Sequence, residues 1–223
     1  MTTETKAISA IVIITILVII GGVFLMNSQS SNLPEVAVNS DILVRPDSPT
    51  KQSEQNHVTI VEFADYECPS CAALHPVLKQ LLNDPEYGKY VTLVYRNIPL
   101  HAGSIQVSVA VQAAGAQGKY WEMHDLVYER QDEWASVAAS NEAKRAELFE
   151  KYATEIGLDI PAWKEALNDD KYVDLIKRDQ ADALTMKIRA TPTLIINGIN
   201  VIKGVVSYEN LKAAVDAELA KNN

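Results

Sequence analysis

The sequence predicts an α/β domain in which the sheet is interrupted by a long helical insertion. Two runs rich in β-branched and aromatic residues, 58–63 and 90–95, flank a stretch of helical periodicity from Cys68 to Leu82. A strand, a helix and a strand in succession form a βαβ unit, which implies parallel strands. The next β-rich run, 193–196, follows only after helical patterns that fill about 102–188. That interval is too long for a simple crossover connection, so it indicates an inserted helical subdomain.

Local signals define the helices of the insertion. Residues Ser104 to Gln117 are rich in Ala and Val and end at Gly118, which predicts a helix. A later apolar stripe is closed by Gly157, a residue type common just past helix C-termini. Pro161 suits the first turn of a short helix that follows.

The C-terminal part returns to the sheet. Asn197-Gly198 directly after the run 193–196 is a strong two-residue hairpin signal, so residues 199–203 are expected to pair with that run. A final helix is then predicted from one apolar face, made of Leu211, Ala214, Val215 and Leu219.

An apolar run lies close to the N-terminus. Ala7 to Met26 are twenty consecutive residues without a formal charge. At 1.5 Å rise per residue they would form a helix about 30 Å long, the thickness of a bilayer core. A buried core helix would rarely be apolar on all sides here, and a cleaved signal peptide would be shorter and end in a small-residue cleavage site. We therefore expect 7–26 to be an uncleaved transmembrane anchor.

The charges around this run predict its orientation. Lys6 precedes it, and the next basic residue is Arg45. Because positive residues favour the cytoplasmic side, residues 1–6 are expected in the cytoplasm and the rest of the chain outside the cell membrane. Residues 27–57 are rich in Ser, Asn, Gln, Pro and Asp, which predicts a tether. Within it, 42–44 could form an edge strand.

Charge and cysteine content narrow the function. The chain has 20 Lys and Arg against 29 Asp and Glu, a formal net charge of −9. That balance gives no support to nucleic-acid binding, which usually needs a basic face. The only two cysteines lie together in Cys68-Pro69-Ser70-Cys71. Since neither can cross-link distant segments, the pair is either redox-active or half of a metal site.

The ordered set of motifs resembles the thioredoxin superfamily. The resemblance spans roughly residues 58–221 and is closest to DsbA-like proteins with a helical insertion, in particular the membrane-anchored BdbD-type oxidases of Gram-positive bacteria. The motifs that carry it are Val61-Glu62-Phe63-Ala64-Asp65-Tyr66-Glu67-Cys68-Pro69-Ser70-Cys71, Gln117-Gly118-Lys119-Tyr120-Trp121-Glu122-Met123-His124 and Ala190-Thr191-Pro192-Thr193. It implies a thioredoxin-like fold.

The position of the cysteines also predicts redox chemistry without the resemblance. A CxxC in the first turn of a helix brings both sulfurs close enough for a disulfide. It also directs Cys68 at the free N–H groups and the positive end of the helix dipole, which favours the thiolate and makes the disulfide an oxidant. Pro69 stiffens the loop and Ser70 adds a hydroxyl, and both are expected to face the substrate. Cys71 is expected to be the shielded sulfur. Asp65 and Glu67 are expected to shape the loop or the substrate surface.

The competing interpretation is a zinc site that includes His75. A structural zinc ion needs four ligands, usually from two such pairs, and the chain has no second cysteine pair. His57, His101 and His124 show no His-x₃₋₅-His spacing. We therefore expect no metal, and no cofactor, because the two cysteines can carry the reaction themselves.

Two further residues are candidates for the site. The resemblance implies that the Thr191-Pro192 bond is cis and lies against the CxxC, with the backbone of Thr191 presented to substrate. The motif alone fits a trans proline at the start of a strand equally well. Glu62 lies in an apolar strand, where burial would raise its pKa. The resemblance implies that it assists proton transfer at the inner cysteine; the alternative is a solvent-facing strand position.

These expectations combine into one function. The chain is expected to be an anchored, extracytoplasmic oxidase that donates the Cys68–Cys71 disulfide to exported proteins. The resemblance implies reoxidation by a DsbB- or VKOR-type membrane partner that passes electrons to quinone. A tethered reductase or isomerase remains an alternative because Thr191 before the proline also occurs in such relatives. A non-catalytic chaperone or binding module is the other alternative.

Overall fold

A mixed five-stranded sheet, in the order β1-β3-β2-β4-β5, lies at the centre of the computed structural model, which describes residues 40–137 and 141–222. The predicted segments 1–6 and 7–26, and residues 27–39 of the predicted tether, lie outside that part. β2 and β3 are parallel, and the other neighbours are antiparallel. The strands are β1 (Thr50–Lys51), β2 (Val58–Ala64), β3 (Val91–Asn97), β4 (Thr193–Ile196) and β5 (Asn200–Lys203).

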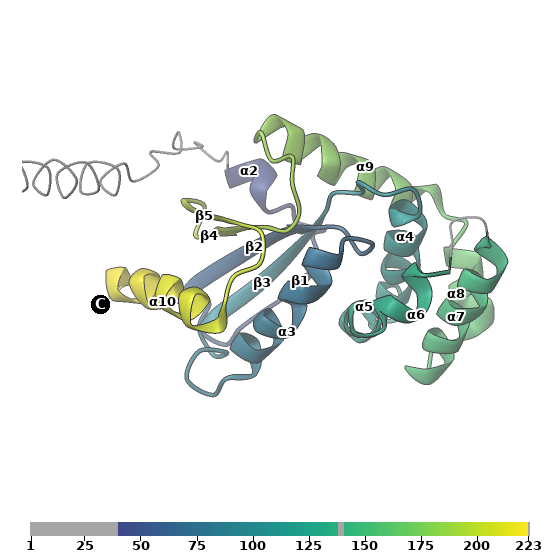
Figure 1. Ribbon diagram of the computed structural model, residues 1–223, viewed down its shortest axis with the longest axis horizontal. Coiled ribbons are helices and arrows are strands. Elements are labelled where there is room, and N and C mark those ends of the chain that lie inside the picture. The colour runs from purple at the N-terminus through teal and green to yellow at the C-terminus, as the bar shows by residue number, and fades with distance from the viewer. Residues whose placement is uncertain (1–39, 138–140, 223) are drawn as a thin grey trace, which may run out of the picture. The chain divides into compact units, whose positions relative to one another are not determined.

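Helices cover both faces of this sheet. Figure 1 shows α3 (Pro69–Asn83) and α10 (Tyr208–Leu219) on one face, and α2 (Ser40–Leu43) and α9 (Asp170–Thr185) on the other. A short 3₁₀ turn, η1 (Ala220–Asn222), follows α10. Within the two described ranges, no helix is both long and apolar enough to cross a membrane.

The side chains of β2 point alternately into two hydrophobic cores, one on each face of the sheet. Val58 and Ile60 pack with α3 and α10, whereas Val61 and Phe63 pack with the core on the opposite face. Each fully buried side chain of this kind contributes about 1.5–3 kcal/mol to stability. Because successive side chains of a strand point to opposite faces, Glu62 lies on the same face as Val58 and Ile60, beneath α3.

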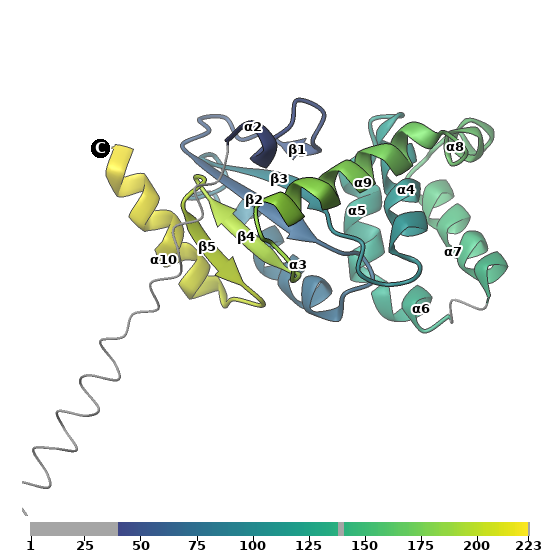
Figure 2. The same ribbon diagram turned by 90° about the horizontal axis from the view of Figure 1, so that it is seen from above.

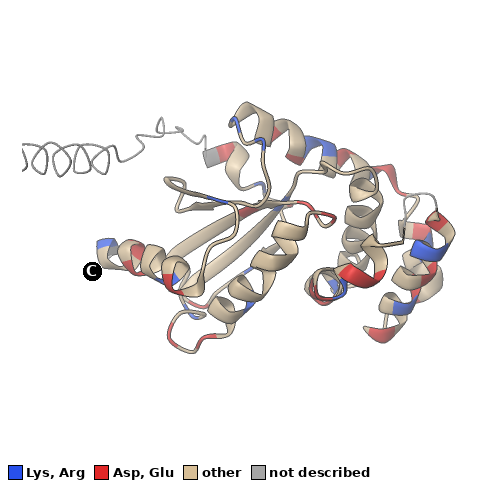
Figure 3. Cartoon of the chain, in the orientation of Figure 1, with Lys and Arg blue, Asp and Glu red and all other residues tan. Residues whose placement is uncertain are grey.

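The helical insertion predicted for about 102–188 is present. It consists of α4 (Ser104–Gly115), α5 (Tyr120–Glu129), α6 (Gln131–Ala135), α7 (Glu142–Glu155), α8 (Ile160–Ala166) and α9. Figures 1 and 2 show α4 to α8 gathered beside the sheet, with α9 running back across it. Basic and acidic residues are interspersed along α7, α8 and α9, whereas α4 carries no charged residue (Figure 3). Pairs such as Lys164–Glu150, at 2.8 Å, join α8 to α7.

The predicted hairpin is present, but its loop has three residues instead of two, because Ile199 lies in the loop and the returning strand begins at Asn200. β4 and β5 pair antiparallel with Ile196 opposite Asn200, so the loop between them is short. Asn197 and Gly198 have φ values of 48° and 74°. The N–H of Ile199 donates to the carbonyl oxygen of Ile196 and closes a turn around these two residues. Asn-Gly accepts two consecutive positive φ values with little strain.

The segment before β2 corrects two predictions. Of the predicted tether 27–57, the described part, 40–57, is folded onto the domain. The edge strand expected at 42–44 is not formed there: residues 42 and 43 belong to α2, and Leu43 is buried. The edge strand is β1 instead, which pairs antiparallel with β3 through Thr50 and Lys51.

Buried Arg96 provides the physical reason for this correction. Its side chain is fully buried at the end of β3 and forms ion pairs with Asp179 and Asp182 of α9. Its Nη1 also donates to the carbonyl oxygens of Ile42 and Leu43, at 2.6 and 2.7 Å. A buried guanidinium is costly unless its N–H donors are satisfied, so the carbonyls at the end of α2 are held against the sheet.

Candidate active site

The two cysteines lie where α3 begins. Cys68 is the N-cap residue, with extended φ and ψ of −77° and 118°, and Pro69 occupies the first turn. No side chain caps this helix end. The backbone N–H groups of Cys71 and Ala72 both point to the carbonyl oxygen of Cys68, at 3.0 and 3.2 Å. The predicted placement of the CxxC at a helix N-terminus is therefore confirmed, and Pro69 and Ser70 are exposed there.

The environments of the two sulfurs differ. Cys71 has no exposed surface, whereas Cys68 retains 9% of its surface. Burial raises the pKa of the Cys71 thiol well above that of a free cysteine, and the charges of Glu62 and Cys68 act in the same direction. Cys71 is therefore the shielded sulfur of the pair, as predicted, and it stays protonated when reduced.

A distant loop closes over the outer cysteine. The Thr191-Pro192 peptide bond is cis, which confirms the prediction. The carbonyl oxygen of Thr191 lies 3.7 Å from the Sγ atom of Cys68. A peptide that bonds covalently to Cys68 would thus lie beside the backbone of Thr191, which is the position expected for a substrate-binding residue.

Glu62 lies beneath the helix that carries the cysteines. Its side chain is 1% exposed, which excludes the solvent-facing alternative. Its Oε1 atom has no hydrogen-bond partner. Burial raises the pKa of this carboxyl from 4.5 to about 8. Because Glu62 is also one of the groups that raise the pKa of Cys71, the carboxyl and the inner thiol are electrostatic neighbours.

The acidic residues beside the motif shape its loop. The buried carboxylate of Asp65 accepts hydrogen bonds from the backbone N–H groups of Glu67, Leu100 and His101. It also lies 2.7 Å from Nδ1 of His101. The bonds from Leu100 and His101 tie the cysteine loop to the loop after β3, and the bond from Glu67 lies within the cysteine loop itself. This agrees with the loop-shaping role expected for Asp65.

Glu67 connects the same loop to the insertion. Its carboxylate accepts bonds from the N–H of Gly103 and the hydroxyl of Ser104 and forms a 3.1 Å ion pair with Arg145 of α7. A Cβ atom on Gly103 would lie 1.8 Å from Nη1 of Arg145. Any larger residue at position 103 would have to displace the paired ends of Arg145 and Glu67.

Gln131 is a functional residue that the sequence analysis missed. This buried residue of α6 donates from Nε2 to the carbonyl oxygens of Tyr66 and Cys68, at 2.7 and 3.1 Å. It fixes the backbone on both sides of Glu67. Its position more than sixty residues after the motif gave no signal, because a glutamine in a helical pattern usually faces solvent.

A buried aromatic cluster lies between the cysteine helix and the insertion. The hydroxyl of Tyr66 contacts the hydroxyl of Tyr120 at 3.2 Å and Nδ1 of His124 at 2.9 Å. The hydroxyls of Tyr95 and Tyr128 are 2.8 Å apart. Burial lowers the pKa of His124 and raises the pKa of Tyr66, so both are neutral near pH 7.

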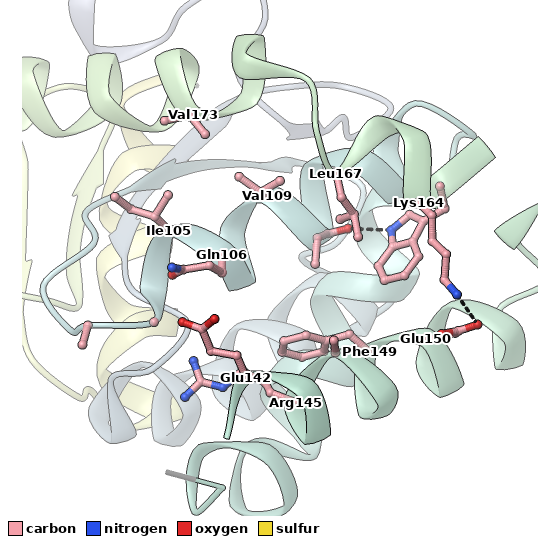
Figure 4. A pocket seen from close by; sticks show the side chains of 15 residues that line it. Ile105, Gln106, Val109, Glu142, Arg145, Phe149, Glu150, Lys164, Leu167 and Val173 are labelled. Carbon is pink, nitrogen blue, oxygen red and sulfur yellow. Dashed lines mark hydrogen bonds and ion pairs between the residues drawn. The ribbon is translucent and has the colours of Figure 1, made fainter. Parts of the chain in front are cut away.

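A cavity of about 480 Å³ lies within the insertion. Figure 4 shows Arg145 on one side of it and the Lys164–Glu150 pair on another. The remaining walls are mostly apolar and include Ile105, Val109, Phe149, Leu167 and Val173. Arg145, in one wall of the cavity, forms an ion pair with Glu67, the residue that precedes Cys68.

Together these features define the class of the protein: a DsbA-like thioredoxin fold with a helical insertion, a CxxC at a helix N-terminus and a facing cis-proline. Residues 52–217 match the family model described as Thioredoxin, and the chain belongs to this family.

Solved structures agree with this assignment. A thioredoxin-like oxidoreductase from Silicibacter pomeroyi DSS-3 is 28% identical with a TM-score of 0.66, covering 83% of this chain and 99% of that one. BdbD from Bacillus subtilis, in its oxidised form, is 24% identical with a TM-score of 0.64, covering 78% and 93%. The thiol-disulfide exchange protein α-DsbA2 from Wolbachia pipientis is 22% identical with a TM-score of 0.67, covering 79% and 90%. The last two comparisons support the fold alone.

A curated relative matches this chain over only a small part of its own length. The Na(+)/H(+) antiporter NhaA 3 of Salinispora tropica is 35% identical over 166 residues, which is 73% of this chain and 23% of the antiporter. The chain thus spans less than a quarter of that relative's length.

Proposed function

We propose that this protein is a thiol–disulfide oxidoreductase that donates the Cys68–Cys71 disulfide to cysteines of exported proteins. The observation that carries the proposal is the asymmetry of the pair at the start of α3. Cys68 lies at the helix N-terminus and retains 9% of its surface, whereas Cys71 is fully buried and its pKa is raised.

The asymmetry assigns a role to each sulfur. A substrate thiolate attacks Sγ of Cys68, the Cys68–Cys71 bond breaks, and Cys71 leaves with the electron pair. Cys71 takes up a proton, and neutral Glu62 is the nearby acid suited to supply it near pH 7. A second substrate thiolate then attacks the substrate sulfur of the mixed disulfide and releases Cys68. The substrate is oxidised by two electrons, and both cysteines end reduced.

Redox titration of the full-length chain in detergent, in glutathione buffers, tests the direction of transfer. A reduction potential of about −120 to −180 mV supports an oxidase, whereas one near or below about −270 mV indicates a reductase. Iodoacetamide alkylation of the reduced protein tests the asymmetry of the pair: Cys68 should be alkylated and Cys71 should not. Equal alkylation of the two cysteines would contradict the proposed roles.

A doubly substituted chain separates catalysis from simple binding. Cys68→Ser with Cys71→Ser should abolish oxidation of a reduced peptide substrate completely and leave the melting temperature of the reduced protein nearly unchanged. Retention of cellular function by this variant would instead favour a tethered chaperone or binding module.

The proposal includes a location and a redox partner. The apolar run 7–26 is the proposed anchor, with the thioredoxin domain outside the cell membrane and a DsbB- or VKOR-type protein reoxidising the cysteines. A membrane-impermeant maleimide should label Cys68 in intact, reduced cells. Labelling only after lysis would contradict this orientation.

A further inference from the structure

Three potential metal ligands meet between α3 and α5. His75 belongs to α3, one turn after Cys71, and His124 and Asp125 are consecutive residues of α5. One ligand atom from each lies within 4.8 Å of the other two. Nε2 of His75 and Oδ1 of Asp125 are only 3.5 Å apart.

The polar atoms at this place are incompletely satisfied. His75 is 6% exposed, yet its Nε2 atom has no hydrogen-bond partner. Oε1 of Glu62 is likewise buried without a partner. Both side chains line one small void of about 10 Å³, together with His124 and Asp125. A buried polar atom without a partner costs about 1–3 kcal/mol, so two of them around one void need an explanation.

A hydrogen bond on the side of the ring away from the void orients His124. Its Nδ1 atom lies 2.9 Å from the hydroxyl of Tyr66, which itself contacts Tyr120. Histidines that bind metals characteristically use one ring nitrogen for the metal and hold the other in a hydrogen bond to an oxygen. The contact to Tyr66 leaves Nε2 of His124 as the available ligand atom.

We propose that His75, His124 and Asp125 form a binding site for one divalent transition-metal cation, with Zn²⁺ as the simplest occupant. In tetrahedral zinc sites with bonds of about 2.1 Å, ligand atoms lie about 3.4 Å apart. The His75–Asp125 separation, 3.5 Å, is close to this value, and the other separations, which are at most 4.8 Å, must shorten where they exceed it when the cation binds. Two imidazoles and a carboxylate suit Zn²⁺, Cu²⁺ or Ni²⁺ better than Ca²⁺ or Mg²⁺.

Two positively charged lysines beside the site are expected to lower its affinity for a cation. Lys79 lies 3.2 Å from Oδ2 of Asp125, and its charge is shared with Glu129; Lys51 lines the same void. Oδ1 of Asp125 still faces His75, and the side chain of Asp125 is 25% exposed, which gives a cation access from solvent. Removing the charge of Lys79, a residue that binds no metal in this proposal, should therefore tighten binding.

The test must keep the cysteines from binding the metal. Full-length protein in detergent is first oxidised, so that both sulfurs are held in the disulfide, and is then titrated with Zn²⁺ against a chromogenic chelator. One equivalent should bind. Co²⁺ in place of Zn²⁺ should give d–d absorption bands without a sulfur-to-cobalt charge-transfer band.

Substitutions then locate the ion. His75→Gln and Asp125→Asn should each weaken binding by about tenfold or more, Lys79→Met should strengthen it, and His57→Gln, at a distant histidine, should leave it unchanged. Because Asp125 and Lys79 are partly exposed, their variants should remain folded even if a histidine variant does not. Absence of binding by the oxidised protein, or equal affinity in the His75, Asp125 and His57 variants, would overturn the proposal. Neither result bears on the disulfide chemistry.

Discussion

The sheet and the helical insertion contribute to the candidate site in different ways. The groups proposed to carry out the reaction, Cys68, Cys71 and Glu62, come from β2 and the start of α3, within ten residues of one another in the sequence. The groups that hold them in place, such as Gln131 and Arg145, come from α6 and α7. The chemistry is local in sequence, whereas its support depends on docking of the insertion. Substitutions in the two regions should therefore have distinguishable effects.

The largest effect on stability is expected where the two regions are joined. Arg96→Met removes the guanidinium that pairs with Asp179 and Asp182. Asp182 keeps its ion pair with Arg45, but the buried carboxylate of Asp179 is left without a countercharge. We expect a loss of about 3–5 kcal/mol in the free energy of unfolding, measured by urea denaturation. Arg178→Met, which removes a pair with Asp47 at the surface, is the control and should cost less than about 1 kcal/mol. Similar losses in the two variants would show that burial of the Arg96 pair is unimportant.

Glu62→Gln should make the protein more stable at high pH and slow disulfide transfer. The folded protein holds the Glu62 proton up to about pH 8, whereas the unfolded chain releases it near 4.5. Between these values the folded state binds more protons, so wild-type stability falls as the pH rises and the loss is complete above about pH 8. The variant lacks this loss and should be more stable at pH 9, by on the order of 5 kcal/mol, but equally stable at pH 4.

Disulfide transfer by the same variant should be slower near pH 7, because a glutamine cannot donate the proton. The measurements are urea denaturation from pH 4 to 9 and oxidation of a reduced peptide. A stability difference that does not change with pH would contradict the raised pKa of Glu62.

Gly103→Ala should break the connection between the cysteine loop and the insertion. The added methyl group would overlap Nη1 of Arg145 at 1.8 Å and Oε1 of Glu67 at 2.6 Å. We expect a loss of about 1–3 kcal/mol in stability. Gly115→Ala is the matched control, since its methyl group would meet Tyr120 at an ordinary 3.4 Å within a helix. Thermal unfolding of both variants tests whether the close approach, and not the loss of a glycine, matters.

Gln131→Ala should give the smallest effect. It removes two hydrogen bonds to the carbonyls that flank Glu67 and should cost about 1–2 kcal/mol. Since Gln131 only positions the loop, disulfide transfer should slow by a factor that is the same at every pH. Gln106→Ala, at an exposed position of α4, is the control. A changed pH profile in the Gln131 variant would show that the insertion takes part in the chemistry itself.

The sequence by itself determined the local features of this protein. The βαβ unit, the CxxC at a helix start, the Asn197-Gly198 hairpin and the buried Glu62 all depend on periodicity and turn chemistry within a few residues. The motif around Pro192 gave the cis bond once the resemblance was recognised. The anchor 7–26 remains a prediction from composition.

Only the tertiary structure decided the contacts between distant segments. Residues 40–57 are polar in pattern but fold onto the sheet, because buried Arg96 requires the carbonyls of α2. Gln131, Arg145 and the meeting of His75 with His124 and Asp125 depend on how the insertion packs against α3. Sequence spacing cannot reveal these partners, because hydrogen bonds and metal ligation depend on distances of a few ångströms that packing alone sets.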